Sequence, residues 1–291
     1  MKVKFITSIY SNLWGTDLGG RPSRKGHYRW SLLSLLKMTD ADFLCYTSSE
    51  EIEELKNFFY VNHNISEDKL EFKVFDLRNT KFSNLINQIK DVEKTKKSDR
   101  CVEIQYSKFH WWWDEDKTYD YYYWIDAGLS HSGLIPNKYL EQTNHERRYY
   151  ESSLFNNVFL NNLIKFTGDK FFMIGKENDK NYWSGTVDRK WYDQYDRKVH
   201  VIGGLFGGKK EIWDEIVTIF ENYLEKLLPE DKRLYHEELI MSLMRVNHND
   251  MFVLKEFDTW WCKDSGPKDL DDSYYDSRIS FYQILEDLNH E

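Results

Sequence analysis

Residues 121–126 read YYYWID, an apolar and mostly aromatic stretch that ends on a carboxylate, and residues 127–128 are alanine and glycine. Strong β-strand propensity in the residues before Asp126 predicts a buried strand with an aspartate at its carboxyl end. A carboxylate there is costly unless a hydrogen-bond donor or a positive charge meets it. An arginine, a backbone cap or a metal ion could supply that partner. The plainer alternative is an aspartate that caps the turn before Gly128.

A second pair of carboxylates lies in YHEELIMSLM, residues 235–244. Apolar residues recur there at helical spacing and predict an amphipathic helix. Glu237 and Glu238 then fall in its first turn, about 100° apart, so at most one is expected to face a pocket easily. Such a residue could serve as a general base or stabilise charge. Compensation of the helix dipole is the structural alternative.

Glycines cluster in GGLFGGKK, residues 203–210, between a predicted strand and a predicted helix. The stretch fits the start of the phosphate-binding pattern G-x-x-x-x-G-K, but Lys210 stands where serine or threonine should hold magnesium. We therefore expect a glycine-rich corner whose backbone can approach a ligand closely, with a simple glycine bulge as the alternative. The glycines concerned are Gly203, Gly204, Gly207 and Gly208.

Basic side chains occur at two places where phosphates or an anionic sugar could bind. Arg24 lies in a glycine-rich loop after the first predicted strand, and Lys108 lies on a predicted helix just before the strand that ends in Asp126. Both residue types form charge-assisted hydrogen bonds to anions. Solvated surface charge is the commoner use of such residues.

Predicted strands and helices alternate through the first 126 residues. The strands cover residues 3–10, 42–48, 70–77 and 121–126. The helices between them cover residues 27–38, 50–59, 84–95 and 101–113. This order predicts an α/β fold with βαβ units and a mostly parallel sheet flanked by helices. Ligands in such sheets bind at the carboxyl ends of the strands, where Thr7, Ser8, Tyr10, Tyr46 and Asp126 fall.

The second half of the chain is less regular. Its predicted strands cover residues 171–175, 199–208 and 251–257, and its clearest helices cover residues 210–228 and 235–246. The sequence contains no internal repeat, and no linker divides it. We therefore expect one domain, 1–291, with a regular first half, 1–130, and a mixed second half, 131–291.

The composition limits the function. A formal net charge of −9 argues against a general nucleic-acid binder, which needs a basic face. Three widely spaced cysteines form no zinc pattern and favour a reducing, cytoplasmic location. No apolar run is long enough to span a membrane, although peripheral contact with a membrane-bound partner stays open. Aromatic residues reach 17%, which packing mostly explains but which also suits sugar binding.

Together, the order of these motifs resembles GT-A glycosyltransferases. The HtrL/YibB-like family is the most similar family, through SKF at 107–109, WIDAG, GGLFGG and HEEL at 236–239. The order is also similar to that of the family containing the blood-group transferases. The resemblance covers roughly residues 3–261 and implies a GT-A-like Rossmann-type fold. The first half would then bind the nucleotide, and the second would form the acceptor side.

The resemblance also implies roles for single residues. Asp126 takes the place of the first aspartate of the DxD metal motif, but Gly128 replaces the second, so a divalent cation, Mn²⁺ or Mg²⁺, loses one ligand. His248 or Asp258 is a candidate to complete the metal site. The alternatives are an ion held by Asp126 with the nucleotide phosphates and water, or no ion at all. Thr7, Ser8 and Tyr10 are placed at the base and ribose. The acceptor side takes in the four glycines, Glu237, Glu238, His236 and Trp260.

The leading hypothesis is therefore transfer of a sugar from a nucleoside-diphosphate sugar, with a UDP-sugar favoured, to a hydroxyl of a glycan or of a lipid- or protein-linked acceptor. Glu238 is preferred over Glu237 as the catalytic carboxylate, by analogy with families that use the later residue of an acidic pair. Two alternatives remain at this point: a non-catalytic carbohydrate-binding protein that uses surface aromatics, and a P-loop-like phosphotransferase.

Overall fold

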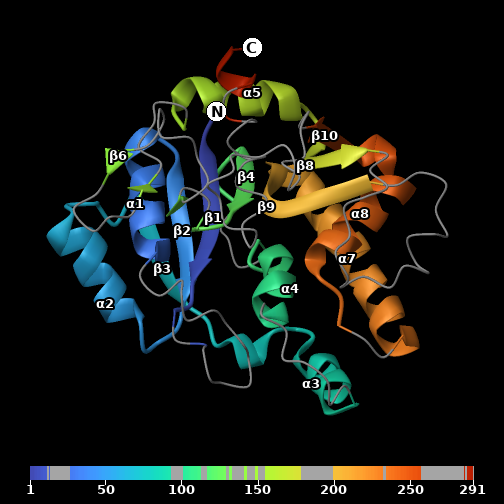
Figure 1. Ribbon diagram of the computed structural model, residues 1–291. Helices are drawn as coiled ribbons and strands as arrows, with labels where there is room; N and C mark the ends of the chain where they lie inside the picture. The colour runs from blue at the N-terminus through green and yellow to red at the C-terminus, as the bar shows by residue number, and fades with distance from the viewer. Residues whose placement is uncertain are drawn as a thin grey trace, which may run out of the picture.

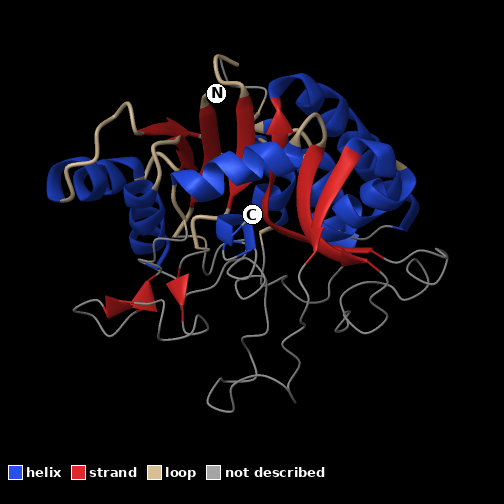
Figure 2. Ribbon diagram, turned by 90° about the horizontal axis from the view of Figure 1, so that it is seen from above, coloured by secondary structure: helices blue, strands red, loops and turns tan. Residues whose placement is uncertain are grey.

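A central sheet with helices on both faces forms the body of the molecule in a computed structural model (Figures 1 and 2). The structure describes residues 1–11, 13, 27–92, 101–112, 117–128, 131–132, 141–142, 148–149, 155–177, 199–231, 234–256, 285 and 287–290. Predictions that concern Arg24, Asp258 and Trp260 lie outside these residues.

The central sheet has seven strands in the order β10-β8-β9-β4-β1-β2-β3. Its strands are β1 (Val3–Ile9), β2 (Asp42–Thr47), β3 (Leu70–Val74), β4 (Tyr121–Ile125), β8 (Phe171–Glu177), β9 (Val199–Lys209) and β10 (Phe252–Glu256). All of these strands run in one direction except β9, which is antiparallel to both of its neighbours, β4 and β8. The mostly parallel α/β sheet expected from the sequence is thus confirmed.

Two hydrophobic cores lie on opposite faces of the sheet. One core is shared with α3 (Ser83–Val92), α4 (Val102–His110), α7 (Lys210–Asp231) and α8 (Glu237–Asn247). The other is shared with α1 (His27–Met38), α2 (Ile52–Lys56) and α5 (Asn157–Thr167). In β1, Phe5 and Ile9 face the second core and Ile6 faces the first, as the alternation of side chains along a strand requires.

Smaller elements complete the described fold. A π-helical stretch, Asn57–Asn62, continues α2, and single 3₁₀ turns occur at Leu77–Asn79 and Asn249–Met251. A separate three-stranded sheet contains β5 (His131–Ser132), β6 (Glu141–Gln142) and β7 (Arg148–Tyr149).

The glycine stretch differs from the prediction. The expected corner is wrong, because β9 continues as one strand through Gly203–Lys209 and α7 follows it directly. Gly207 pairs with Tyr123 of β4, and a Cβ atom on Gly207 would lie 2.2 Å from the carbonyl oxygen of Tyr122. The φ angle of Gly207, +153°, also disfavours other residues. Gly207 and Gly208 therefore let two strands pack closely and do not form a phosphate-binding loop.

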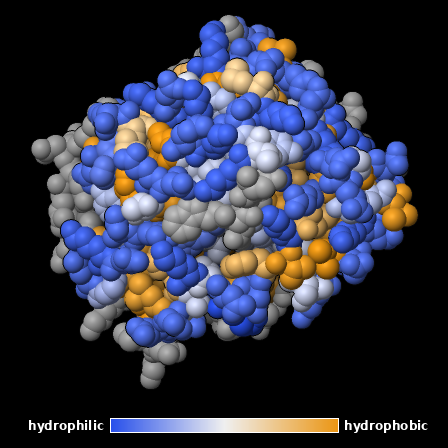
Figure 3. Space-filling model, turned by 180° about the vertical axis from the view of Figure 1, so that it is seen from behind, coloured by the Kyte–Doolittle hydropathy of each residue, from blue (hydrophilic) through white to orange (hydrophobic). Residues whose placement is uncertain are grey.

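Most of the large aromatic side chains that the structure describes support the core. Trp111, Trp112, Trp124 and Trp213 are all fully buried. On the face drawn in Figure 3, the hydrophobic atoms of described residues form small separate groups among hydrophilic ones. The large aromatic side chains of the described residues thus serve mainly packing.

No helix in the described ranges combines the length and the apolar character that crossing a membrane requires.

Candidate active site

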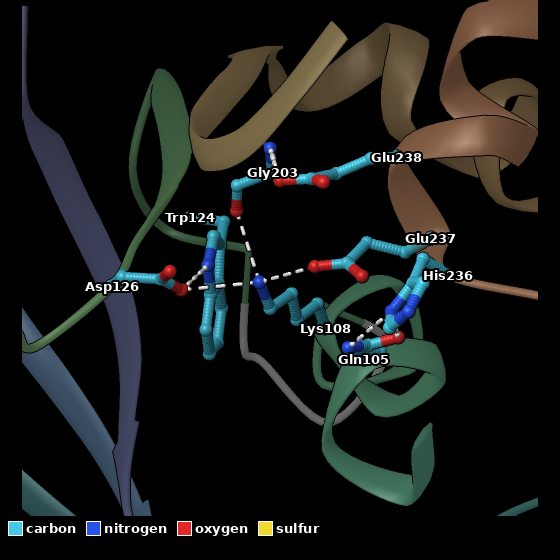
Figure 4. A network of polar contacts seen from close by, with 8 residues as sticks. All are labelled: Gln105, Lys108, Trp124, Asp126, Gly203, His236, Glu237 and Glu238. Atoms are coloured by element: carbon cyan, nitrogen blue, oxygen red, sulfur yellow. Dashed lines mark hydrogen bonds and ion pairs between the residues drawn. The ribbon is translucent and has the colours of Figure 1, made fainter. Parts of the chain in front are cut away.

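Asp126 lies directly after β4, and its charge is met by a lysine. The Nζ atom of Lys108 lies 3.1 Å from Oδ1 of Asp126, and Nε1 of Trp124 donates a hydrogen bond of 2.8 Å to the same oxygen (Figure 4). Nζ of Lys108 also lies 5.1 Å from the centre of the Trp124 ring, where a cation is attracted to the ring face. The positive partner that the sequence required for Asp126 is therefore an ammonium group from α4.

Lys108 joins four parts of the fold. Besides Asp126, its ammonium group donates to the carbonyl oxygen of Gly203 in β9 at 2.9 Å and to Oε1 of Glu237 in α8 at 2.7 Å (Figure 4). An ammonium group has three hydrogens to donate, and the three acceptors match that number. The Lys108 side chain is only 6% exposed. We call Lys108, Asp126, Glu237, Glu238 and Gly203 the carboxylate–lysine network.

Electrostatics keep the ammonium group charged. Burial alone would lower the pKa of Lys108, but the carboxylates of Asp126 and Glu237 outweigh that effect and raise the pKa above its usual value.

Glu237 and Glu238 approach Gly203 in different ways. Glu237 is buried, with a side chain 4% exposed, and Lys108 connects it to the Gly203 carbonyl. Glu238 is half-buried, and its Oε1 accepts a 3.1 Å hydrogen bond from the Gly203 backbone N–H. The expectation that at most one of them faces a pocket easily stays a prediction, although both side chains reach the surroundings of Gly203. Two long side chains that leave a helix about 100° apart can both reach the backbone of one residue.

Contacts from α4 and β9 fix the start of α8. Tyr106 donates from its hydroxyl to the carbonyl oxygen of Tyr235 at 2.6 Å, and the Gln105 amide lies 3.2 Å from Nδ1 of His236. Ser242 accepts from the backbone N–H of Val201 in β9 at 3.0 Å. His236 thus serves at the helix start, in the N-cap position, with extended backbone angles. These contacts define where Glu237 and Glu238 enter the site.

Two of the tyrosines expected at the nucleotide belong to an aromatic layer under the carboxyl ends of the strands. Tyr46 is 1% exposed, stacks on Trp111 with ring centres 4.6 Å apart, and donates to the Trp111 carbonyl oxygen. Tyr10 donates to the carbonyl oxygen of Phe75 at 2.9 Å. Both hydroxyls are thus engaged within the protein, so we correct their assignment to nucleotide contacts. Tyr46 and Tyr10 act as packing groups.

The two remaining residues predicted at this edge differ in exposure. Thr7 is completely buried and has no hydrogen-bond partner for its hydroxyl among the described residues. Its side chain lies on the face of β1 that packs into a core, so the assignment of Thr7 to the nucleotide is corrected as well. Ser8 is half-buried and is the better placed of the two to contact a ligand.

The sequence analysis missed Glu51, which fixes the end of β1. Its carboxylate accepts the backbone N–H of Ser11 at 2.8 Å and a hydrogen bond from Oγ of Ser48 at 3.3 Å. Burial raises the pKa of Glu51 above its usual value, although the hydrogen bonds from Ser11 and Ser48 act in the opposite direction. The available signal in the sequence was a glutamate three residues after Ser48, at the end of the strand predicted over residues 42–48.

Lys108 and Trp124 both contact Oδ1 of Asp126, so a divalent cation would have to bind the second oxygen, and the metal site stays a prediction. A metal ion on Oδ1 itself would lie close to a like charge. The described residues contain no group of three histidine, cysteine, aspartate or glutamate side chains that could hold a metal. We therefore derive no chemical step through a metal ion.

His248 is not a partner of Asp126. It follows the last residue of α8, whereas Glu237 begins that 11-residue helix. At a rise of about 1.5 Å per residue, the two ends are about 16 Å apart. The His248 ring instead lies edge-on to Tyr223, with ring centres 6.3 Å apart. The prediction that His248 completes a metal site with Asp126 is therefore corrected.

Comparison with known proteins supports the fold. No protein-family model matches the chain, and no curated protein matches it in sequence. The crystal structure of mouse xyloside xylosyltransferase 1, apo form, matches with a TM-score of 0.50 and 12% identity over 92% of each chain. The structure of 4-diphosphocytidyl-2C-methyl-D-erythritol synthase from Anaerococcus prevotii matches with a TM-score of 0.45 and 10% identity, over 99% of this chain and 95% of that one.

At 12% identity, the likeness to the xylosyltransferase concerns the fold alone. The chain thus has the GT-A-like, Rossmann-type α/β architecture that the sequence predicted. The finer resemblance to the HtrL/YibB-like family is not tested by these matches and stays a prediction.

Proposed function

We propose that the protein is a nucleotide-sugar-dependent glycosyltransferase. It takes a sugar from a nucleoside-diphosphate sugar, with a UDP-sugar favoured, and transfers it to a hydroxyl of a glycan or of a lipid- or protein-linked acceptor. The GT-A-like fold supports a transferase of this kind, and one matching structure is that of a xylosyltransferase. The acceptor and the sugar are left open.

The carboxylate–lysine network is the observation that carries this proposal. Ligands of open α/β sheets bind outside the carboxyl ends of the parallel strands. Asp126 lies at the carboxyl end of β4, and Gly203 lies beside it, because the backbone N–H of Asp126 donates to the neighbouring Gly204 carbonyl at 2.9 Å. Glu237 and Glu238 reach the same place from α8. Ionisable groups from both halves of the chain thus meet at the edge where a ligand is expected.

The proposed reaction is a displacement at the anomeric carbon of the sugar. The acceptor oxygen forms a bond to that carbon, the bond to the diphosphate oxygen breaks, and its electron pair leaves with the nucleoside diphosphate. The acceptor proton passes to a carboxylate, which acts as a general base. We assign that role to Glu238, because Glu237 is buried against Lys108 while Glu238 is half-buried beside the Gly203 N–H.

The two alternative functions, a P-loop-like phosphotransferase and a carbohydrate-binding protein, require different features of the structure. A P-loop-like phosphotransferase needs a loop between the strand and the helix, and β9 passes directly into α7. A carbohydrate-binding protein needs neither a nucleotide nor Asp126.

A nucleotide panel tests the proposal. UDP, GDP, dTDP and CMP are each added to the protein with and without Mn²⁺, and the melting temperature is measured, because a ligand that binds only the folded state raises it. The corresponding sugar nucleotides are then incubated with the protein, and released nucleotide is quantified. We expect one nucleoside diphosphate to raise the melting temperature of the protein. We also expect the protein to hydrolyse the corresponding sugar nucleotide. No stabilisation and no hydrolysis with any of them would contradict the proposal.

A further inference from the structure

Resting on the proposed function, we propose that Lys108 is a positioning residue that joins Asp126 to Glu237 and fixes the positions of both carboxylates. In this role the ammonium group does not bind the phosphates of the donor. It orients Asp126 at the donor side and neutralises Glu237, so that Glu238 is the carboxylate of α8 that serves the acceptor.

The hydrogen bonds of Lys108 support this role over phosphate binding. Its three acceptors, Asp126, Glu237 and Gly203, lie 2.7–3.1 Å from Nζ, and the side chain is 6% exposed. A ligand phosphate would have to displace one of these acceptors. The earlier assignment of Lys108 to the nucleotide is therefore replaced by one in which it acts through Asp126 and Glu237.

Lys108 is the positive partner of the buried Glu237 carboxylate, at 2.7 Å. Its second oxygen, Oε2, is buried and has no hydrogen-bond partner among the described residues. A buried carboxylate without a positive partner takes up a proton, because burial disfavours its ionised form. Asp126 differs, since its side chain is 42% exposed and Trp124 also donates to it. Removal of the Lys108 charge should therefore protonate Glu237 first.

Gly203 leaves the room that the contacts of Lys108 require. A Cβ atom at this position would lie 2.6 Å from Oε1 of Glu237, the atom that accepts from Lys108. Only a residue without a side chain leaves the ammonium group room to contact both the Gly203 carbonyl and Glu237. The absence of a side chain at Gly203 therefore helps to position Lys108.

The test compares Lys108→Met, Glu237→Gln and the double variant by melting temperature between pH 5 and pH 8, without any ligand. We expect Lys108→Met to melt well below the wild type at pH 8 and to recover part of the difference at pH 5, where Glu237 takes up a proton. The double variant should recover most of the loss at pH 8, because it buries no uncompensated charge. An equal loss at both pH values, with no recovery in the double variant, would show that Lys108 serves packing alone.

Lys4→Met is the matched control. Lys4 is as buried as Lys108, with a side chain 7% exposed, but its partner Glu71 is 47% exposed and can be solvated when the lysine is lost. The Lys4→Met loss of melting temperature should not depend on pH between 5 and 8. The same recovery in Lys4→Met as in Lys108→Met would contradict the specific role of Glu237.

Kinetics separate this proposal from the proposed function. In the double variant, which we expect to fold, kcat should fall about 100-fold with a smaller change in the KM of the donor, since Asp126 is no longer oriented. A KM increase with unchanged kcat would indicate direct donor binding and overturn the positioning role. If the wild type turns over no sugar nucleotide, the proposed function fails, while the pH-dependent melting still decides the role of Lys108.

Discussion

Asp126 and Glu237 meet at one ammonium group, that of Lys108, which is shared between them. The distances from Lys108 to the two carboxylates are 3.1 and 2.7 Å. The sequence predicted Asp126 at a strand end and Glu237 and Glu238 in the first turn of a helix. It did not reveal that Lys108 bridges them, because Lys108 and Glu237 are 129 residues apart and meet only through packing of α4 against α8.

Asp126→Asn should keep the fold and remove most of the transfer or donor hydrolysis. Asparagine retains an acceptor for Trp124 but loses the charge that attracts Lys108. We expect turnover to fall about 100-fold or more, by analogy with the loss of a group that acts on the reacting atoms. Turnover is measured per folded molecule, together with the melting temperature. A variant that melts far earlier but keeps its turnover would make Asp126 a structural cap.

Glu237→Gln and Glu238→Gln should have unequal effects. Glu237→Gln leaves Lys108 buried with one charged partner fewer, so it should lower the free energy of unfolding by about 1–3 kcal/mol. Glu238→Gln should cost about 100-fold in turnover with little change in stability, as expected of a general base. Chemical denaturation and steady-state kinetics on both variants provide the measurement. Near wild-type turnover in both would leave α8 without a catalytic role.

The raised pKa of Lys108 predicts how stability changes in alkali. The folded protein retains this proton above the unfolded pKa of about 10.4, whereas the unfolded chain loses it. The stabilisation is therefore complete below that pH and is lost as the pH rises through the folded pKa, by about 1.4 kcal/mol per pH unit. Wild type should thus lose stability more steeply than Lys108→Met above pH 10.4. The free energy of unfolding of both proteins is measured by urea denaturation at each pH. If it falls equally with pH in wild type and Lys108→Met, the pairing of Lys108 with the two carboxylates is contradicted.

At the scale of elements, α4 organises the site. It carries Lys108, and through Gln105 and Tyr106 it also fixes the start of α8. The sequence predicted most helices and strands because hydrophobic periodicity and the βαβ order are local signals. It failed at β9, where glycines were taken as a corner, because close pairing of two strands depends on residues distant in the chain.

Two glycines of β9 should respond differently to alanine. Gly207→Ala places a Cβ against the backbone of Tyr122, which cannot move away, and should destabilise the fold by about 1–3 kcal/mol or more. Gly203→Ala meets only the end of the Glu237 side chain, which can shift. It should lose most of its turnover while it still folds, because Glu237 is moved away from Lys108. Melting temperature and turnover of both variants are compared. Full turnover in Gly203→Ala would contradict the role of this position.

At the scale of the whole molecule, the directions of the strands in the central sheet determine where the site lies. Only β9 runs against the other strands of the central sheet, and it lies between β4 and β8. Its first half therefore passes beside the carboxyl end of β4, where Asp126 and Gly203 meet. The mostly parallel architecture followed from the sequence, whereas the reversal of β9 did not, since periodicity does not reveal the direction of a strand. The division into a nucleotide-binding half and an acceptor half stays a prediction.

The position of a bound nucleotide tests the central claim most directly. The diphosphate that stabilises the protein most is soaked into crystals or added before crystallisation, and its location is determined. The account predicts the nucleotide at the carboxyl ends of β1 and β4, near Ser8, with its diphosphate facing Asp126. A nucleotide bound instead at the start of α7, beside Lys209 and Lys210, or at any site remote from Asp126, would contradict it.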